Sequence, residues 1–292
     1  MSSASTAEQA APPGFPPAPP SGRGSARRGE RPARRRGSAW WLGALGFVLF
    51  FAAIEVLSRT SGLSEQTLPR ATTILSRMVT LFADGDFLGS VGITVAGALL
   101  GLAIAIALAV PCGVLLGSSR WALTVTSPLI ELLRPIPAVA VIPPALLLFG
   151  TGMTMKLFLV AYAAFWIVLY NTIYAVRDVD PVTKDSARSY GFSRNQVLFK
   201  VSLPSAAPAI YTGVRIACTA ALLVAIGVEL IGGGVAGVGE WLVEAQEAVT
   251  RKADVYAGAF FTGLIGLAFN LLLNIGERRA FSWSIAGRKE AA

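Results

Sequence analysis

The residue types that carry most enzyme chemistry are scarce in this sequence. Its 292 residues include no histidine and two cysteines, Cys112 and Cys218, each inside an apolar stretch. Without histidine the chain cannot form Ser-His-Asp or Cys-His triads, HExxH zinc sites or a histidine proton relay. Two isolated cysteines indicate neither a disulfide framework nor a metal cluster. We therefore expect no catalytic residues, no metal ligands and no enzyme activity.

Phosphate-binding loops are a second group of motifs that could carry chemistry. No lysine follows a glycine, so the sequence lacks the G-x-x-x-x-G-K-[ST] loop that cradles the phosphates of ATP. Gly232, Gly234 and Gly237 do match the dinucleotide-binding pattern G-x-G-x-x-G. That pattern requires a preceding strand and a βαβ unit, whereas a long apolar run precedes it here. We expect no bound cofactor and interpret these glycines as a turn or re-entrant segment at the outer face.

Five charged residues lie within long apolar runs: Glu55, Glu131, Arg134, Arg215 and Glu229. A charge inside a membrane is costly and usually faces a cavity or a charged partner. Arg134, Arg215 and Glu229 are therefore candidate pathway or gating residues, with structural roles as the alternative. Glu131 and Arg134 are three apart and could pair on a helix. Arg215 could attract an anion or extend to the membrane surface.

One polar segment, KDSARSYGFSRNQVLFKVSLPSAAP at Lys184–Pro208, separates two apolar runs. Upstream of it, Asp180 and the proline that follows predict the start of a helix, and Gly191 suits the left-handed residue just past its end. The S-x-x-Q pattern from Ser193 predicts a capping box and a second helix, which Pro204 should stop or redirect. Two short helices that meet at a glycine are suited to docking into a groove on a partner, with an ordinary interhelical loop as the alternative.

Composition places these segments in a membrane protein. Apolar residues make up 54% of the chain and charged residues 14%, and the mean hydropathy is +0.61, more apolar than one soluble core requires. We expect an all-α membrane protein with six spans, because six apolar runs approach the roughly 20 residues of one crossing. These runs are Trp40–Leu57, Ser90–Gly117, Trp121–Gly150, Leu157–Val176, Ala207–Ile231 and Val255–Ile275. Prolines should break the third run.

The basic residues are arranged like membrane topology signals and not like a nucleic-acid site. The formal net charge is +8, and seven arginines lie in the first 37 residues. If this tail is cytoplasmic, seventeen of the 25 Lys and Arg fall on the cytoplasmic side and six, including Lys156, on the other. The positive-inside rule then puts both termini and the polar segment in the cytoplasm. We expect a multi-pass protein of the inner (plasma) membrane with no nucleic-acid partner.

Composition also divides the chain into parts. Residues 1–38 are rich in proline and arginine and are expected to be a disordered cytoplasmic tail. Residues 39–285 should form the six-span domain, with a cytoplasmic loop at 178–206. Residues 286–292 should form a short cytoplasmic C-terminal tail.

Two further features predict packing between helices. Leu68–Phe82 places Ala71, Ile74, Leu75, Met78, Val79 and Phe82 on one face, so it should be an amphipathic helix on the outer surface that packs against the spans. The alternative is that it helps to receive a protein partner on that side. The Gly-x-x-x-Gly pairs at 97 and 101 and at 113 and 117 permit close approach of a second helix.

The polar segment resembles the EAA loop of ABC importer permeases. The family pattern is E-A-A, three residues, G, nine residues and I-x-L-P, and the spacing here is identical. The matching positions are Asp185, Ser186, Ala187, Gly191, Val201, Leu203 and Pro204. Three of them carry replacements that keep an acid, a small residue and a β-branched aliphatic residue. Other stretches, such as ELLRPIPAVAVIPPALLLFGTG, are similar to the nitrate/sulfonate/bicarbonate (taurine-type) branch of these permeases.

The resemblance implies a type I ABC importer permease fold with about six transmembrane helices. It also implies partners: a second permease copy in a homodimer, cytoplasmic ABC ATPase subunits that grip the loops and bind the ATP, an extracytoplasmic solute-binding protein, and membrane lipid. The expected function is that of the permease subunit that forms the solute pathway, for a small anion such as a sulfonate or nitrate. The alternatives are an ion-gradient-driven secondary transporter and an intramembrane enzyme.

Overall fold

The computed structural model describes residues 39–62, 64–65, 67–248 and 250–280. The tails expected at 1–38 and 286–292 lie outside the described residues. The chain divides within its first helix into two compact units, Met1–Val48 and Leu49–Ala292. The first unit contributes the opening turns of that helix, and the core and the candidate site lie in the second.

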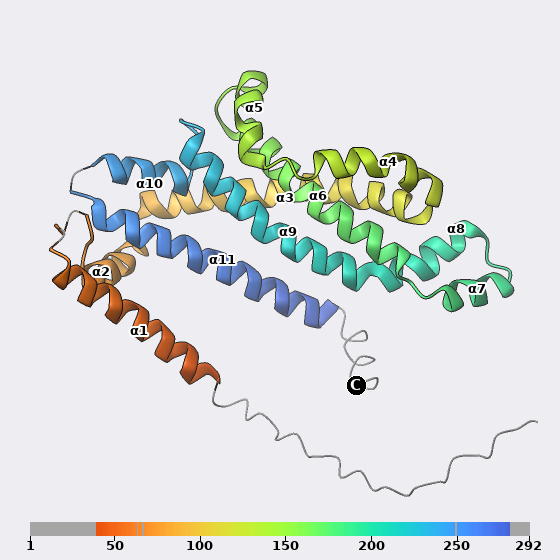
Figure 1. Cartoon of the computed structure of the whole chain (residues 1–292), viewed down its shortest axis with the longest axis horizontal. Helices are drawn as coiled ribbons and strands as arrows, with labels where there is room; N and C mark the ends of the chain where they lie inside the picture. The colour runs from red at the N-terminus through yellow and green to blue at the C-terminus, as the bar shows by residue number, and fades with distance from the viewer. Residues whose placement is uncertain (1–38, 63, 66, 249, 281–292) are drawn as a thin grey trace, which may run out of the picture. The chain divides into compact units, whose positions relative to one another are not determined.

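The described part of the chain is helical and contains no strand (Figure 1). The helices are α1 (Ala39–Thr60), α2 (Ala71–Leu81), α3 (Gly85–Ser118), α4 (Arg120–Leu133), α5 (Ile142–Phe149), α6 (Met153–Arg177), α7 (Pro181–Ser189), α8 (Arg194–Val197), α9 (Leu203–Ile231), α10 (Val238–Glu247) and α11 (Lys252–Ala280). A 3-10 turn, η1 (Ala138–Val141), precedes α5, and a π turn, η2 (Leu198–Ser202), precedes α9.

Five of the described helices are long and apolar enough to cross a membrane: α1, α3, α6, the continuous α8–η2–α9 helix and α11. Helix α4 and the η1–α5 segment are together long and apolar enough for a sixth crossing if they form one span, and they are bent by 82° relative to each other. Pro135 and Pro137 lie in the break, where proline removes a backbone donor and clashes with the preceding turn. With the bent pair counted as one span the total is six, as expected, and the third run is broken where its prolines predicted.

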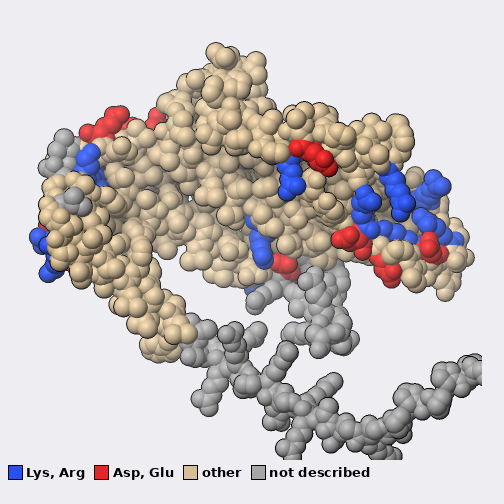
Figure 2. All heavy atoms as spheres, viewed as in Figure 1, with Lys and Arg blue, Asp and Glu red and all other residues tan. Residues whose placement is uncertain are grey.

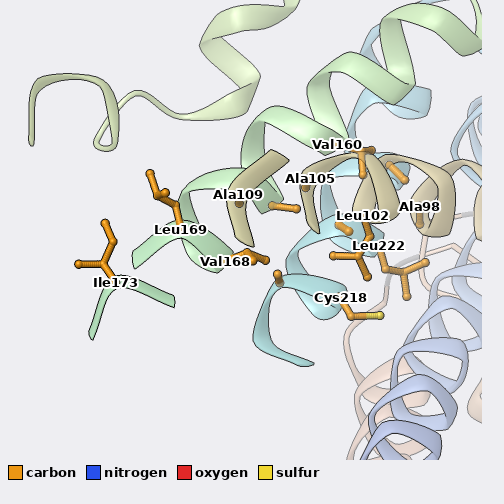
Figure 3. Close-up of a cluster of buried hydrophobic side chains, with 14 of the residues drawn as sticks. Ala98, Leu102, Ala105, Ala109, Val160, Val168, Leu169, Ile173, Cys218 and Leu222 are labelled. Carbon is orange, nitrogen blue, oxygen red and sulfur yellow. The ribbon is translucent and has the colours of Figure 1, made fainter. Parts of the chain in front are cut away.

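The main hydrophobic core forms where α3, α6 and α9 pack together (Figure 3). Helix α3 contributes small residues such as Ala105 and Ala109, which let the neighbouring helices approach closely. A Cβ atom added at Gly101 would lie 2.6 Å from the Val160 side chain, and one added at Gly113 would lie 2.6 Å from that of Thr172. All four glycines of the two Gly-x-x-x-Gly pairs face α6, so the predicted close approach is confirmed.

Helix α2 packs against the spans, as its apolar pattern predicted. Ile74 and Leu81 join a buried cluster with Phe87 of α3 and Trp241 of α10, in which the Phe87 and Trp241 rings are 4.7 Å apart between centroids. The predicted face is wrong in part, because three of its residues are exposed: Leu75, Val79 and Phe82. Helix α2 carries apolar side chains on more than one side, so apolar spacing alone did not identify its buried face.

Candidate functional site

The polar segment begins as a helix that is held by local hydrogen bonds. The Asp180 carboxylate accepts hydrogen bonds from the Val182 N–H at 2.9 Å and from the Thr183 hydroxyl at 3.3 Å. Pro181 occupies the first turn of α7, where its missing N–H is not needed. These contacts confirm the predicted helix start.

Gly191 makes the turn between α7 and α8. Its φ is +83°, in the left-handed region that glycine adopts most readily. The Gly191 N–H donates to the Arg188 carbonyl at 2.9 Å, and the Phe192 N–H donates to the Ala187 carbonyl at 3.2 Å. These two bonds form a Schellman motif, which closes the end of α7. The predicted left-handed conformation of Gly191 is confirmed.

The second helix starts at the predicted capping box and does not stop where we expected. The Ser193 N–H donates to Gln196 Oε1 at 2.9 Å, and the Gln196 N–H donates to Ser193 Oγ at 3.3 Å. The prediction that Pro204 stops the helix is wrong, because α8 continues through η2 into α9. The helix does change direction between α9 and α8 (Figure 1), as the alternative prediction of a redirected helix has it. Pro204 lies in the first turn of α9, where proline is tolerated, and the wider π turn before it accommodates the ring.

The seven positions of the EAA-like pattern divide into a surface group and a packed group. The exposed positions are Asp185, Ser186, Gly191 and Pro204, and the half-buried positions are Ala187, Val201 and Leu203. Leu203 packs against the buried cluster of Val114 and Val176 at the ends of α3 and α6. Leu203 therefore attaches the end of the loop to the spans, and the surface group is exposed.

Lys184 attaches α7 to the end of α6. Its ammonium group donates to the Val176 carbonyl at 3.2 Å and to the Arg177 carbonyl at 3.5 Å. A cation at this position satisfies carbonyl groups that the end of a helix leaves without partners. Partial burial, together with the nearby Arg188 charge, lowers the pKa of Lys184.

The outward side of the loop carries large exposed side chains. Tyr190 is 85% exposed and Val182 is 69% exposed. Asp185 and Arg188 form a surface ion pair at 2.8 Å. We call the unit formed by α7, Gly191 and α8 the knuckle.

A buried ion pair lies far from the knuckle, where α6 begins and α9 ends. Lys156, in the first turns of α6, pairs with Glu229, near the end of α9, and both side chains are 0% exposed. Glu229 Oε2 accepts hydrogen bonds from the Thr94 hydroxyl at 2.9 Å and from the Gly239 N–H at 2.9 Å. The pair therefore joins four helices, because Thr94 belongs to α3 and Gly239 to α10.

The position of Lys156 corrects the sequence analysis, which placed it in an outer loop as a topology signal. Helix α6 begins at Met153, before the apolar run that starts at Leu157. The Lys156 ammonium group also lies 3.3 Å from the carbonyl oxygens of Ile93 and Ala236. A lysine directly before a span, with an acid inside another span, is the signal that could have identified this pair.

The glycine-rich stretch that resembles a dinucleotide motif is a tight turn between α9 and α10. Gly233, Gly234 and Gly237 have φ values of +55°, +68° and +152°. A Cβ atom on Gly237 would also collide with the Glu229 carboxylate. The turn that we predicted is therefore present, and its glycines allow the backbone to approach Glu229.

The other two candidate pathway residues also have defined contacts. Arg215 of α9 pairs with Glu277 of α11 at 2.7 Å, a partner that the sequence analysis missed. The Arg134 guanidinium lies 4.1 Å from the centroid of the Tyr170 ring. Arg134 forms no ion pair with Glu131 or with any other described carboxylate, so the suggested Glu131–Arg134 pair is wrong. Within the described ranges, no group of three or more His, Cys, Asp and Glu residues could hold a metal ion.

The geometry defines a class of protein: a helical membrane domain with a break between two helices, a close-packed helical core and a capped polar knuckle. The chain belongs to the family described as the binding-protein-dependent transport system inner membrane component, whose model matches residues 109–281. The match covers the broken span, the knuckle and the helices that follow, up to α11.

Relatives within the family are transport permeases. The chain is 30% identical over 254 residues to the aliphatic sulfonates transport permease protein SsuC of Bacillus subtilis (strain 168), which covers 87% of this chain and 91% of that protein. It is 30% identical over 226 residues to the taurine transport system permease protein TauC of Escherichia coli (strain K12), covering 76% and 82%.

Solved structures show the same fold. A crystal structure of an amino acid ABC transporter matches with a TM-score of 0.55 and 22% sequence identity, covering 66% of this chain and 93% of that one. The family and its permease relatives make this chain a non-catalytic permease subunit of an ABC importer, and the family implies an ATPase and a binding protein as partners. The secondary transporter and the intramembrane enzyme are not favoured.

Proposed function

We propose that the knuckle is the site at which a separate cytoplasmic ATPase drives this permease. The observation that supports this most directly is the Schellman turn at Gly191, which holds the EAA-like positions at a corner with Tyr190 and Val182 outward. Packing of Leu203 at the ends of α3 and α6 would transmit a movement of the knuckle to the core. ATP would be bound by the partner and not by this chain.

We further propose an orientation and an assembly. The excess of Lys and Arg around the knuckle supports a cytoplasmic position for it and for both termini. Two copies of the chain would form a homodimer in the membrane, with the solute pathway between them and the binding protein at the opposite ends of the spans. The broken third span supports a pathway, because irregular backbone at membrane depth is tolerated where it is buried or lines water.

The proposed solute is a small anion of the sulfonate class. The names of SsuC and TauC support this class, since taurine is itself a sulfonate. Among the three candidate pathway residues, Glu229 and Arg215 each have an oppositely charged partner. Arg134 faces the Tyr170 ring and forms no ion pair with a described carboxylate, and so is the best candidate to attract an anion.

The solute class is tested on the binding protein that serves this importer. Taurine and short alkanesulfonates should raise its thermal unfolding midpoint, because a ligand that binds only the folded state stabilises it. A shift with neutral or cationic compounds and none with sulfonates would contradict the proposed class, while leaving the role of the knuckle untouched.

The knuckle is tested by Gly191→Val. Valine at φ +83° should be strained by about 1 kcal/mol or more and should turn α8 away from α7. A Cβ atom at Gly191 meets no other atom within 4 Å, so the effect should arise from the backbone alone. We expect normal membrane insertion with loss of ATPase co-purification and of uptake.

Gly62→Val is the matched control. Gly62 has a φ of +67° and equally open surroundings, and it follows α1 outside the knuckle. This variant should suffer similar local strain and still assemble with the ATPase. Wild-type assembly and uptake in Gly191→Val would show that the knuckle is only a connecting loop.

A further inference from the structure

A large basic recess lies behind the knuckle. It is a cavity of about 1010 Å³ between the turn that joins α3 to α4, the end of α6, and the inner side of α7 and α8. Five cations and one carboxylate line it: Arg120, Arg177, Lys184, Arg188, Arg194 and Asp185. Figure 2 shows Lys and Arg side chains gathered over this end of the molecule.

The positive charge of the recess is mostly not neutralised. The single lining carboxylate, Asp185, is already paired with Arg188. Arg120, Arg177 and Arg194 form no ion pair with any carboxylate among the described residues. An anion that enters the recess would therefore meet three guanidinium groups that are free to bind it, and a guanidinium binds phosphate oxygens through paired hydrogen bonds.

The recess opens at the level where the spans end. Gly117 and Ser118 belong to the last turn of α3, Arg120 begins α4, and Arg177 ends α6. Basic residues in this position lie at the boundary between the apolar core of a bilayer and water. A ligand anchored in the membrane could reach them without leaving it.

An exposed apolar row on α4 leads away from the recess. Trp121, next to Arg120, is 77% exposed, and Val125, Leu129 and Leu132 follow at helical spacing with 58%, 57% and 70% exposure. Residues four and then three apart lie on one face of a helix. This face offers a surface for acyl chains directly beside the cations, and tryptophan is common at the membrane boundary.

We propose that the recess binds the headgroup of an anionic phospholipid, with its phosphate held by Arg120, Arg177 and Arg194 and its acyl chains along α4. A bound headgroup would join the α3–α4 turn to α6 and α8, and so stabilise the knuckle from its membrane side. Asp185 and Arg188 line the recess, whereas Tyr190 and Val182 do not, so an ATPase that docks through Tyr190 and Val182 could bind while the lipid stays in place.

The test uses the permease purified with its ATPase in neutral detergent, at fixed ionic strength. Phosphatidylglycerol should bind saturably and at least about tenfold more tightly than phosphatidylcholine with the same acyl chains. The triple variant Arg120→Gln, Arg177→Gln, Arg194→Gln should lose this preference. The control Arg59→Gln, Arg70→Gln, Lys252→Gln removes the same net charge outside the recess and should keep it.

Further arms separate the other occupants. The triple Arg→Lys variant keeps the charge and should retain part of the preference for phosphatidylglycerol. It replaces the glutamine variant in the test if that variant fails to fold. Equal binding of the two lipids, unchanged binding in the glutamine variant, or displacement of the lipid by millimolar inorganic phosphate would overturn the proposal. If the lipid binds the permease alone and does not bind the complex with the ATPase, the ATPase occupies the recess and the proposal is wrong. ATPase co-purification, measured on the same variants, tests the proposed function separately.

Discussion

Lys156 and Glu229 are buried charges that stabilise the fold only as a pair. Removing an ion from water costs several kcal/mol, and a buried pair offsets this only when its geometry and hydrogen bonds are good. Here Thr94 and Gly239 donate to the carboxylate, and two backbone carbonyls lie beside the ammonium group. The pair joins the helix ends around the glycine-rich turn, so its loss should weaken the packing of all four helices.

We predict that Lys156→Met lowers the free energy of unfolding by about 3–5 kcal/mol, because it leaves the Glu229 carboxylate buried without its counter-charge. Adding Glu229→Gln should recover part of the loss, since a neutral amide can still accept the Thr94 hydrogen bond. Thermal unfolding midpoints in detergent, measured for the wild type, the single variant and the double variant, check this. A double variant no more stable than Lys156→Met would show that the two charges are not coupled.

The sequence predicted contacts between residues that are close together in the chain. It did not predict contacts between residues that are far apart in the chain. Asp180, Gly191 and Ser193 act on backbone groups within a few residues, so their patterns predicted their hydrogen bonds. Lys156 and Arg215 have partners more than sixty residues away. No local pattern identifies such a partner, and a small error in where a span begins was enough to place Lys156 in a loop.

At the scale of elements, the α3–α6 contact depends on the absence of side chains at a few positions. Gly101 leaves no room for a methyl group against Val160, whereas a Cβ atom at Gly92, earlier in α3, would meet nothing within 4 Å. The same substitution at these two glycines should therefore change the stability of the protein in opposite directions.

We predict that Gly101→Ala destabilises the protein by about 1–3 kcal/mol, because α3 and α6 must separate to admit the methyl group. Gly92→Ala should stabilise it by up to about 1 kcal/mol, because alanine restricts the unfolded chain and favours helix. Unfolding midpoints of both variants in the same detergent provide the measurement. Equal shifts of the same sign would contradict the packing of α3 on α6.

The boundaries of elements were less predictable than their existence. Hydropathy located the apolar runs, and prolines located the break between α4 and η1. The continuity of α8 with α9 could not be inferred, because Pro204 is a helix breaker by local rules. Leu198 and Leu203 pack on the cluster at the ends of α3 and α6, and these tertiary contacts favour a continuous helix through the π turn.

At the scale of the whole molecule, the described spans have two distinct ends. Helix α2 leads into the start of α3, whereas the knuckle follows α6 at its end, where Gly117 at the end of α3 faces Val176. Ser64 and Tyr190 are exposed at these opposite ends of α3. They can therefore report the orientation of the chain in the membrane.

We predict that a membrane-impermeant maleimide labels Ser64→Cys in intact cells and labels Tyr190→Cys only after permeabilisation, because the excess of Lys and Arg puts the knuckle inside. The background for both should be Cys112→Ser, Cys218→Ala. The reverse labelling pattern would invert the topology, and with it the proposed contact between the knuckle and a cytoplasmic ATPase.

The π turn at Leu198–Ser202 contains one residue more than the same turn would need as α-helix. It lies between α8 of the knuckle and α9. Each π hydrogen bond spans one residue more than an α bond, so tightening this turn into α-helix releases a residue. A helix rotates by roughly 100° per residue. We expect the knuckle to rotate about the helix axis through part of this angle without any break in α9. A force applied at Gly191 would then reach the core as torsion, a motion that can reorient side chains along α9 while the helix keeps its place among its neighbours.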